Sequence, residues 1–136
     1  MEILKLKKGS LQKALNQLKS SLDDYKKEEY AKIYDKLRDS VIQRFEFCYD
    51  TLWKFLKIYL EQTKHISINP PTPRRTFRGC LEHNLISEKE LSILINMAAD
   101  RNAASHTYNE RLAEHISARI PAYYETTKQI LANLSK

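Results

Sequence analysis

The sequence is poor in cysteine, glycine and proline, and it has no long hydrophobic run. It contains two cysteines, two glycines and four prolines in 136 residues. Two cysteines are too few for a disulfide framework, and Cys48 and Cys80 stand in apolar or helical surroundings, so we expect reduced thiols in a cytoplasmic protein. No apolar stretch approaches the ~18 residues of a membrane span, and the first residues lack the apolar core of a signal peptide. We therefore expect neither secretion nor a membrane as partner.

Most familiar active-site motifs are also absent. The sequence has no glycine-rich phosphate loop, no Cys-x-x-Cys pair, no His-Glu-x-x-His and no nucleophile elbow. The four histidines show no spacing typical of metal ligands; they are His65, His83, His106 and His115. We therefore expect no metal and no other cofactor.

The hydrophobic pattern predicts helices throughout. Apolar residues recur at spacings of three and four between Leu11 and Tyr25 and again between Tyr30 and Tyr59, as on one face of an amphipathic helix. The second stretch has no proline or glycine before residue 70, so it can be one long helix or two collinear helices. The pattern leaves this choice open.

Local signals predict the boundaries of the later helices. Three prolines make residues 65–73 a loop. Thr72 before Pro73 is typical of a helix N-cap, and the helix should run to about His83. Gly79 inside it should allow a close helix crossing. The sequence Ser87-Glu88-Lys89-Glu90 is a capping box that opens a fourth helix.

The last helix carries its apolar residues from Leu112 to Leu134, and Pro121 in its interior should kink it near residues 117–120. No strand-like alternation and no internal repeat occur. A chain of this length is typical of a single domain, here residues 1–136. The fold class is therefore all-α, an antiparallel four- to five-helix up-and-down bundle.

Positive charge is concentrated in one segment. The formal net charge is +6, and residues 54–78 carry six lysines and arginines against a single Glu61. A basic patch is more informative about a nucleic-acid partner than total charge. Arg74, Arg75 and Arg78 are candidates for docking RNA phosphates, although residues at the start of a helix are as often simply solvated.

One polar stretch, residues 100–110, lies where the fourth helix should end and the fifth begin. On an uninterrupted helix, Arg101 and His106 would lie about 140° apart around the axis. However, Thr107-Tyr108-Asn109-Glu110 is a capping box, which predicts a break just after His106. His106 and Tyr108 would then lie at a helix N-terminus that favours a phosphate. A polar corner between helices that binds nothing explains the same residues, and the residues alone leave both interpretations open.

The spaced set Arg101-x4-His106-x-Tyr108 resembles the motif of the HEPN toxins found in HEPN–MNT toxin–antitoxin modules. Over most of its length, the chain also resembles the nucleotidyltransferase substrate-binding protein family, small HEPN proteins encoded beside a minimal nucleotidyltransferase (MNT). Three segments occur in the family's order: RFEFCYDTLWKFLKIYLE, PPTPRRTFRGCLEHNLIS and MAADRNAASHTYNE. The match is more specific for the family than for the activity.

The resemblance implies a HEPN-like homodimer whose motifs meet at a dimer cleft, and a metal-independent endoribonuclease activity. His106 would be the acid/base group for attack of a ribose 2′-OH on the neighbouring phosphate, since imidazole titrates near neutrality. Arg101 would stabilise charge on the phosphoryl oxygens. Tyr108 would accept AMP from the cognate nucleotidyltransferase, which would block the cleft. Asn102 belongs to the same motif and would orient it.

HEPN proteins often add a polar residue from an earlier helix, and Glu46 and Asp50 are the candidates here. Both are also explained as ordinary charges on a helix surface. The aromatic residues Trp53, Tyr49 and Tyr59 are expected in the core or at a dimer interface rather than as platforms for bases.

Three functions from different classes remain. The first is a toxin-type endoribonuclease neutralised by a cognate nucleotidyltransferase. The second is a non-catalytic subunit that binds substrate or nucleotide for that enzyme. The third is a structural bundle with a vestigial motif, which the complete Arg101, His106 and Tyr108 set disfavours.

Overall fold

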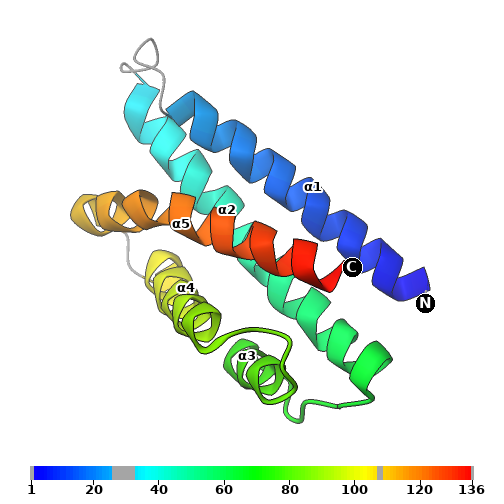
Figure 1. Ribbon diagram of the computed structural model, residues 1–136. Helices are drawn as coiled ribbons and strands as arrows, with labels where there is room; N and C mark the ends of the chain where they lie inside the picture. Colours follow the sequence, from blue (N-terminus) through cyan, green and yellow to red (C-terminus); the bar gives the residue numbers. More distant parts are fainter. Residues whose placement is uncertain (1, 26–32, 107–108, 136) are drawn as a thin grey trace.

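Five α-helices make up the chain in the computed structural model, which describes residues 2–25, 33–106 and 109–135 (Figure 1). The helices are α1 (Glu2–Tyr25), α2 (Tyr34–Tyr59), α3 (Pro73–Glu82), α4 (Glu88–His106) and α5 (Glu110–Leu134). No strand occurs in these ranges, so the all-α prediction is confirmed. None of the helices is long and apolar enough to cross a membrane within the described residues.

The second helix is continuous. α2 runs without a break from Tyr34 and passes directly into a π-helical turn, η2 (Leu60–Lys64). His65 ends this turn in the left-handed region, with φ 58°. Of the two arrangements that the sequence left open, a single helix is therefore correct from Tyr34 onward.

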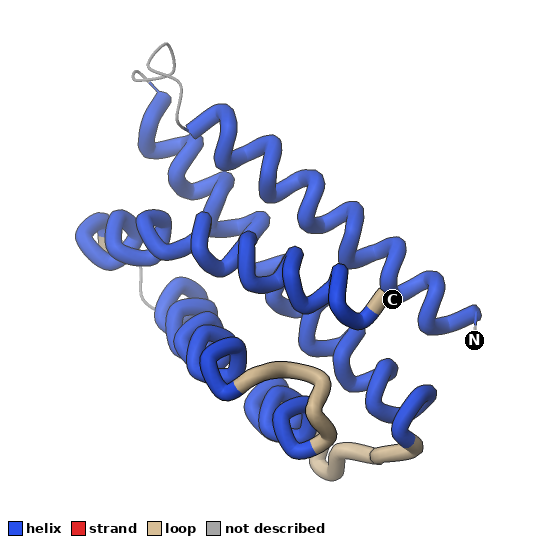
Figure 2. The backbone as a smooth tube through the Cα atoms, viewed as in Figure 1, coloured by secondary structure: helices blue, strands red, loops and turns tan. Residues whose placement is uncertain are grey.

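α2 is the centre of the fold and packs against each of the other four α-helices. α1 lies antiparallel beside it, α5 crosses it, and the shorter α3 and α4 lie on its remaining side (Figures 1 and 2). The core consists of the apolar stripes of these helices; its fully buried members include Leu11, Leu15, Leu18, Phe45, Leu52, Leu56, Leu94, Ile116 and Ile120.

Local capping fixes the starts of α3 and α4 as predicted. The Thr72 hydroxyl accepts a hydrogen bond from the Arg75 amide at 3.2 Å, and Pro73 is the first helical residue. At α4, the Glu90 amide donates to Ser87 Oγ at 3.1 Å, and the Ser87 amide donates to Glu90 Oε1 at 2.8 Å. These reciprocal bonds form the predicted capping box.

The close approach expected at Gly79 is present, and its partners are the loop before α3 and the first residue of η2, which continues α2. A Cβ atom at Gly79 would lie 3.0 Å from the Ile68 Cδ1 atom and 3.4 Å from Leu60 Cδ1. The buried glycine therefore lets the loop after η2, and η2 itself, pack directly on the backbone of α3.

The chain breaks between α4 and α5 as predicted, but with a different cap. α4 ends at His106 and α5 begins at Glu110. The N-cap is Asn109, whose side-chain oxygen accepts a hydrogen bond from the Leu112 amide at 3.2 Å. Glu110 is thus the first helical residue rather than the third residue of α5 that the capping box predicts; Thr107 itself lies outside the described residues. The helix then continues through Pro121 to Leu134.

Candidate functional site

Arg101 is held by a carboxylate from another helix. Its Nε atom donates to Asp50 Oδ1 at 3.3 Å, and its Nη2 atom donates to Asp50 Oδ2 at 3.0 Å. The two parallel bonds fix the plane of the guanidinium group as well as its position. Asp50 belongs to α2 and Arg101 to α4, so this contact also joins the two helices.

Glu46 and Ser105 complete the surroundings of this guanidinium group. Arg101 Nη1 lies 3.2 Å from Glu46 Oε2 and also donates to the Ser105 hydroxyl, which itself donates to Glu46 at 3.0 Å. Glu46 lies one helical turn before Asp50 on α2, so both carboxylates face α4. Both acids therefore contact the motif arginine across the interface between α2 and α4.

A cleft of about 490 Å³ opens beside Arg101. Its lining residues come from three helices and are Tyr49, Asp50, Thr72, Pro73, Arg74, Ala98, Arg101 and Asn102. Arg74 is the second residue of α3, so the fold brings one arginine of the basic segment into the same cleft as the motif arginine. Arg74 and Arg101 are therefore close in space, although the basic segment and the motif are far apart in sequence. Arg75 and Arg78 are exposed on α3 and do not line this cleft.

The surroundings in this cleft shift the pKa values of Arg101 and Tyr49. The hydrogen bonds that Arg101 donates to the Asp50 carboxylate raise the pKa of Arg101 above its ordinary value, which keeps this group cationic at any working pH. Burial raises the pKa of Tyr49 to about 12, although nearby Arg74 and Arg101 act in the opposite direction. The Tyr49 phenol is therefore neutral at physiological pH, and the fixed charges are two cations and the Asp50 carboxylate.

The remaining motif residues are only partly described. Asn102 is exposed on α4 and lines the cleft next to Arg101. His106 is the last residue of α4, but its side chain lies outside the described part of the structure, as does Tyr108 entirely. The motif therefore spans the end of α4 and the connection to α5.

The backbone of α4 places Arg101 and His106 on different sides of one helix. The helix is uninterrupted between them, so five residues correspond to about 140° of rotation around the axis. Arg101 faces α2, where it meets Asp50. A site that uses both residues from one chain would have to reach around the end of α4.

Asp100, the residue before Arg101, anchors the same helix to α5. Its carboxylate accepts two hydrogen bonds from Arg119, both at 2.8 Å, and one from the Tyr123 hydroxyl at 2.5 Å. Asp100 is only 8% exposed, so this is a largely buried acceptor with all its bonds supplied by α5. Asp100 thus binds α4 to α5, and the next residue, Arg101, binds α4 to α2.

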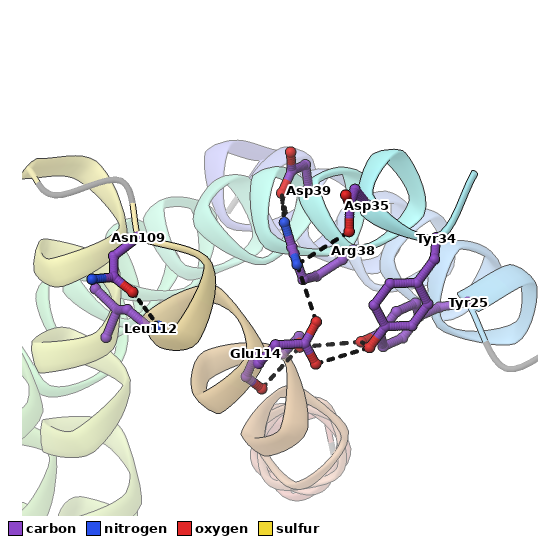
Figure 3. A network of polar contacts seen from close by, with 9 residues as sticks. Tyr25, Tyr34, Asp35, Arg38, Asp39, Asn109, Leu112 and Glu114 are labelled. Atoms are coloured by element: carbon purple, nitrogen blue, oxygen red, sulfur yellow. Dashed lines mark hydrogen bonds and ion pairs between the residues drawn. The ribbon is translucent and has the colours of Figure 1, made fainter. Parts of the chain in front are cut away.

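A second polar network fixes the start of α5 (Figure 3). Arg38 on α2 is only 2% exposed, and its Nη1 atom lies 3.0 Å from Glu114 Oε1 and 3.4 Å from Asp35 Oδ1. Tyr34 donates to the other oxygen of Glu114 at 2.8 Å and lies 2.5 Å from the Tyr25 hydroxyl. The network therefore ties α1, α2 and α5 together just after the motif.

The role of Arg38 was missed in the sequence, although a signal was present. Tyr34, Arg38, Val41 and Phe45 are spaced by four, three and four residues, so Arg38 stands on the buried stripe of α2. A single cation on an apolar stripe indicates a buried ion pair. Its partner Glu114 was not recognisable because it lies 76 residues further along the chain.

A smaller cavity of about 290 Å³ lies on the other side of Glu46. It is walled by α2, the end of α4 and the start of α5, and its lining residues are Asp39, Ile42, Gln43, Glu46, Ala104, Asn109, Leu112, Ala113 and Ile116. Its lining combines apolar side chains with two carboxylates and two amides. Within the described ranges, no group of three or more acidic, histidine or cysteine side chains has a geometry that could hold a metal ion.

The helical bundle and the polar break between α4 and α5 define a HEPN-like substrate-binding fold. The chain belongs to the family described as nucleotidyltransferase substrate binding protein like, whose model matches residues 6–136. Among solved structures, a protein from Thermus thermophilus is 32% identical, with a TM-score of 0.80 over 93% of this chain and 99% of that one. No curated protein sequence matches this chain.

Two further solved structures share the fold at lower identity. A Haemophilus influenzae protein, described as having the fold of a substrate binding domain of a nucleotidyltransferase, is 23% identical, with a TM-score of 0.81 over 95% of this chain and 99% of that one. A tri-AMPylated Shewanella oneidensis HEPN toxin in complex with an MNT antitoxin is 20% identical, with a TM-score of 0.75 over 99% and 98%.

Proposed function

We propose that this protein is the HEPN toxin subunit of a two-component module, a metal-independent endoribonuclease that a cognate minimal nucleotidyltransferase neutralises. The observation that carries the proposal is the fixed guanidinium group of Arg101 in a cleft that also contains Arg74. The family, and the fold shared with a HEPN toxin bound to an MNT antitoxin, support the same conclusion.

The chemistry follows from the residue types. The His106 imidazole accepts the proton of a ribose 2′-OH as that oxygen bonds to phosphorus, and a proton is returned to the 5′-oxygen as its bond to phosphorus breaks. The products are a 2′,3′-cyclic phosphate and a free 5′-OH. Arg101 stabilises the charge that develops on the phosphoryl oxygens. Asp50 and Glu46 position Arg101, and Asn102 supplies an amide at the rim of the cleft.

A homodimer could bring a histidine of the second chain to Arg101. Because positions 101 and 106 lie on different sides of α4, a second copy related by a two-fold axis could place its His106 beside the first copy's Arg101. Two equivalent sites would result.

Tyr108 is the proposed acceptor of AMP from the nucleotidyltransferase partner. The phenol oxygen would bond to the α-phosphorus of ATP as the bond from that phosphorus to the leaving pyrophosphate breaks, and the phenol proton would pass to solvent. The attached AMP would add a nucleotide and a negative charge within the motif, which would exclude RNA from the cleft and repel its phosphates. The AMPylated state of the Shewanella oneidensis toxin supports this assignment.

The test of the activity is cleavage of a labelled single-stranded RNA in the presence of a chelator. Arg101→Ala and His106→Ala should each abolish cleavage while helicity stays unchanged. Arg111→Ala and His115→Ala, which remove an exposed residue of each type from α5, are the matched controls and should cleave normally. An inactive wild-type protein would contradict the proposed activity.

The test of the regulation uses the nucleotidyltransferase partner and labelled ATP. The wild-type chain should become labelled and lose activity, whereas Tyr108→Phe should do neither. Tyr124→Phe on α5 is the control. Equal labelling of all three chains would remove Tyr108 from the acceptor role.

A non-catalytic subunit that presents substrate or nucleotide to the transferase is the second candidate. The family description and the Haemophilus influenzae structure favour it. The pairing of Arg101 with Asp50 and Glu46 also favours it, because two carboxylates weaken a single cation's attraction for RNA. Under this alternative the protein alone does not cleave RNA, and it binds nucleotide only together with its partner.

A further inference from the structure

A cavity next to the Arg101 cleft has no role in the proposed reaction. It measures about 300 Å³ and is lined by Lys7, Trp53, Lys54, Lys57, Ile58 and Pro71. Half of these residues are lysines, and Trp53 is only partly buried. An aromatic side chain among lysines is typical of sites for single-stranded nucleic acid, in which the ring stacks on a base and the cations meet phosphates.

This cavity and the Arg101 cleft lie along one stripe of α2. Glu46, Asp50, Trp53 and Lys57 are spaced by four, three and four residues, so they share one side of the helix. Asp50 lines the Arg101 cleft and Lys57 lines the second cavity. These two positions are seven residues, or about 10 Å, apart along the axis.

The opposite wall is also continuous from one cavity to the other. Pro71 lines the Trp53 cavity, and the next three residues, Thr72, Pro73 and Arg74, line the Arg101 cleft. An extended polymer such as a single nucleic-acid strand that enters at Trp53 can therefore follow this wall past Arg74 to Arg101. We name the two cavities together the α2 groove.

The two ends of the α2 groove differ in charge. At the Arg101 end, Asp50 lies among the lining residues and offsets one arginine. At the Trp53 end, the six lining residues include three lysines and no carboxylate, although Lys57 pairs with Glu61 at 3.2 Å just outside. A polyanion would therefore gain more of its electrostatic binding energy at the Trp53 end.

We propose that the α2 groove binds single-stranded RNA, with Trp53 stacked on a base and Lys7, Lys54 and Lys57 holding the neighbouring phosphates. The choice of RNA as ligand rests on the proposed function. The groove gives the RNA a docking site about two helical turns of α2 away from Arg101. The residues that bind the substrate are therefore different from the residues that cleave it. Trp53 is then a binding residue rather than only a core aromatic.

The experiment uses the single tryptophan of the chain as its own reporter. The wild-type protein is titrated with a 2′-O-methyl oligoribonucleotide of about 12 nucleotides, which cannot be cleaved because its 2′-oxygen is blocked. Tryptophan fluorescence should fall in a saturable manner as a base stacks on Trp53. Anisotropy of a labelled copy of the oligonucleotide gives the Kd independently.

Charge variants locate the phosphates. Lys7→Ala combined with Lys54→Ala should weaken binding about tenfold at low salt and reduce the slope of log K against log salt by 1 to 2, that is by about one per contacted phosphate. Lys36→Ala combined with Lys128→Ala removes the same charge from exposed positions on α2 and α5, and should leave both values unchanged. Trp53→Phe should retain binding in part, because a phenyl ring still stacks.

The outcomes separate this inference from the proposed function. Anisotropy that reports binding without any fluorescence change would place RNA elsewhere and overturn the inference, whether or not cleavage is observed. Fluorescence quenching by the oligonucleotide without cleavage of ordinary RNA would keep the groove and remove the ribonuclease. Quenching only by the nucleotidyltransferase partner, or no binding of the oligonucleotide at all, would overturn the groove.

Discussion

Asp50 on α2 receives two hydrogen bonds from Arg101 on α4, at 3.3 and 3.0 Å, and so fixes the guanidinium group of the motif. The side chain of Arg101 is 25% exposed and that of Asp50 is 38% exposed. Such a pair stabilises the fold only modestly, because water screens both charges. Its larger effect is to hold Arg101 in one orientation within the cleft.

The first prediction concerns this pair. A double-mutant cycle of Asp50→Ala and Arg101→Ala should give a coupling free energy of about 1 kcal/mol, at the upper end for exposed pairs because the contact is bidentate. Urea unfolding of the wild type, both single variants and the double variant measures it. The Lys19–Asp23 pair is the control, since it joins side chains that are 54% and 53% exposed. Its coupling should be below about 0.5 kcal/mol, and equal values for the two pairs would contradict the prediction.

The second prediction concerns the anchor of α4 on α5. Tyr123→Phe should lower the free energy of unfolding by about 1–2 kcal/mol, because a hydrogen bond to the largely buried Asp100 carboxylate is lost. Tyr124→Phe on the same helix removes a hydroxyl that makes no such bond and should change stability little. Urea denaturation followed by far-ultraviolet circular dichroism measures both. A smaller loss for Tyr123→Phe than for Tyr124→Phe would contradict the assigned role.

The third prediction concerns the network of Figure 3, in which Arg38 is buried and its carboxylate partners are about half exposed or more. Arg38→Ala should destabilise the fold by about 2–3 kcal/mol, because it removes a buried side chain together with its charge-assisted hydrogen bonds. Glu114→Gln should cost only about 1 kcal/mol, since Arg38 keeps Asp35 and Asp39. Arg44→Ala at an exposed position of α2 is the control. Equal losses for Arg38→Ala and Arg44→Ala would show that the network does not stabilise the fold.

The fourth prediction concerns alkaline pH. Burial raises the pKa of Cys48 and of Cys80 from 9.0 to about 12, so the folded state holds these protons more tightly than the unfolded state. Their contribution to stability is therefore complete below pH 9 and is lost as the pH rises from 9 to 12. Burial and Asp100 act in the same direction on Tyr123, whose pKa is raised to about 12.

Urea titrations at a series of pH values measure this dependence. The free energy of unfolding should fall steadily above pH 9, and Cys48→Ala combined with Cys80→Ala should flatten the decline. At pH 8, a thiol reagent should react with the wild-type chain only as fast as the protein unfolds. Rapid labelling of both thiols in the native state would contradict their burial.

The sequence predicted those features that depend on neighbouring residues. The capping box at Ser87 and the cap at Thr72 were predicted correctly because each involves residues three apart. The cap of α5 was predicted two residues too early, because the capping box at residues 107–110 gave its start, whereas the helix is capped by Asn109 and begins at Glu110.

The features that the sequence could not predict depend on how helices pack. Nothing in the spacing of Arg74 and Arg101 places them in one cleft, since this requires α3 and α4 to pack side by side with the N-terminus of α3 near Arg101. Contact of Glu46 and Asp50 with Arg101 likewise depends on which side of α2 meets α4. The motif named the candidate residues of the site, whereas the residues that surround them required the fold.

The last prediction tests whether one site is built from two chains. Arg101→Ala and His106→Ala are each inactive under the proposed mechanism, but they should complement one another if the sites are shared across a two-fold axis. In a mixed dimer, one site then loses both residues and the other keeps both. Equal amounts of the two variants, unfolded together and refolded, should recover roughly a quarter of wild-type cleavage, since half of the dimers are mixed and each has one intact site.

The control for this experiment is a chain that carries both substitutions, mixed with each single variant in the same way. Neither mixture should recover activity, because no site then keeps both residues. Native mass spectrometry confirms that mixed dimers form. Mixed dimers of the two single variants without cleavage would show that Arg101 and His106 of one site belong to the same chain, and the end of α4 would then have to bend to bring them together.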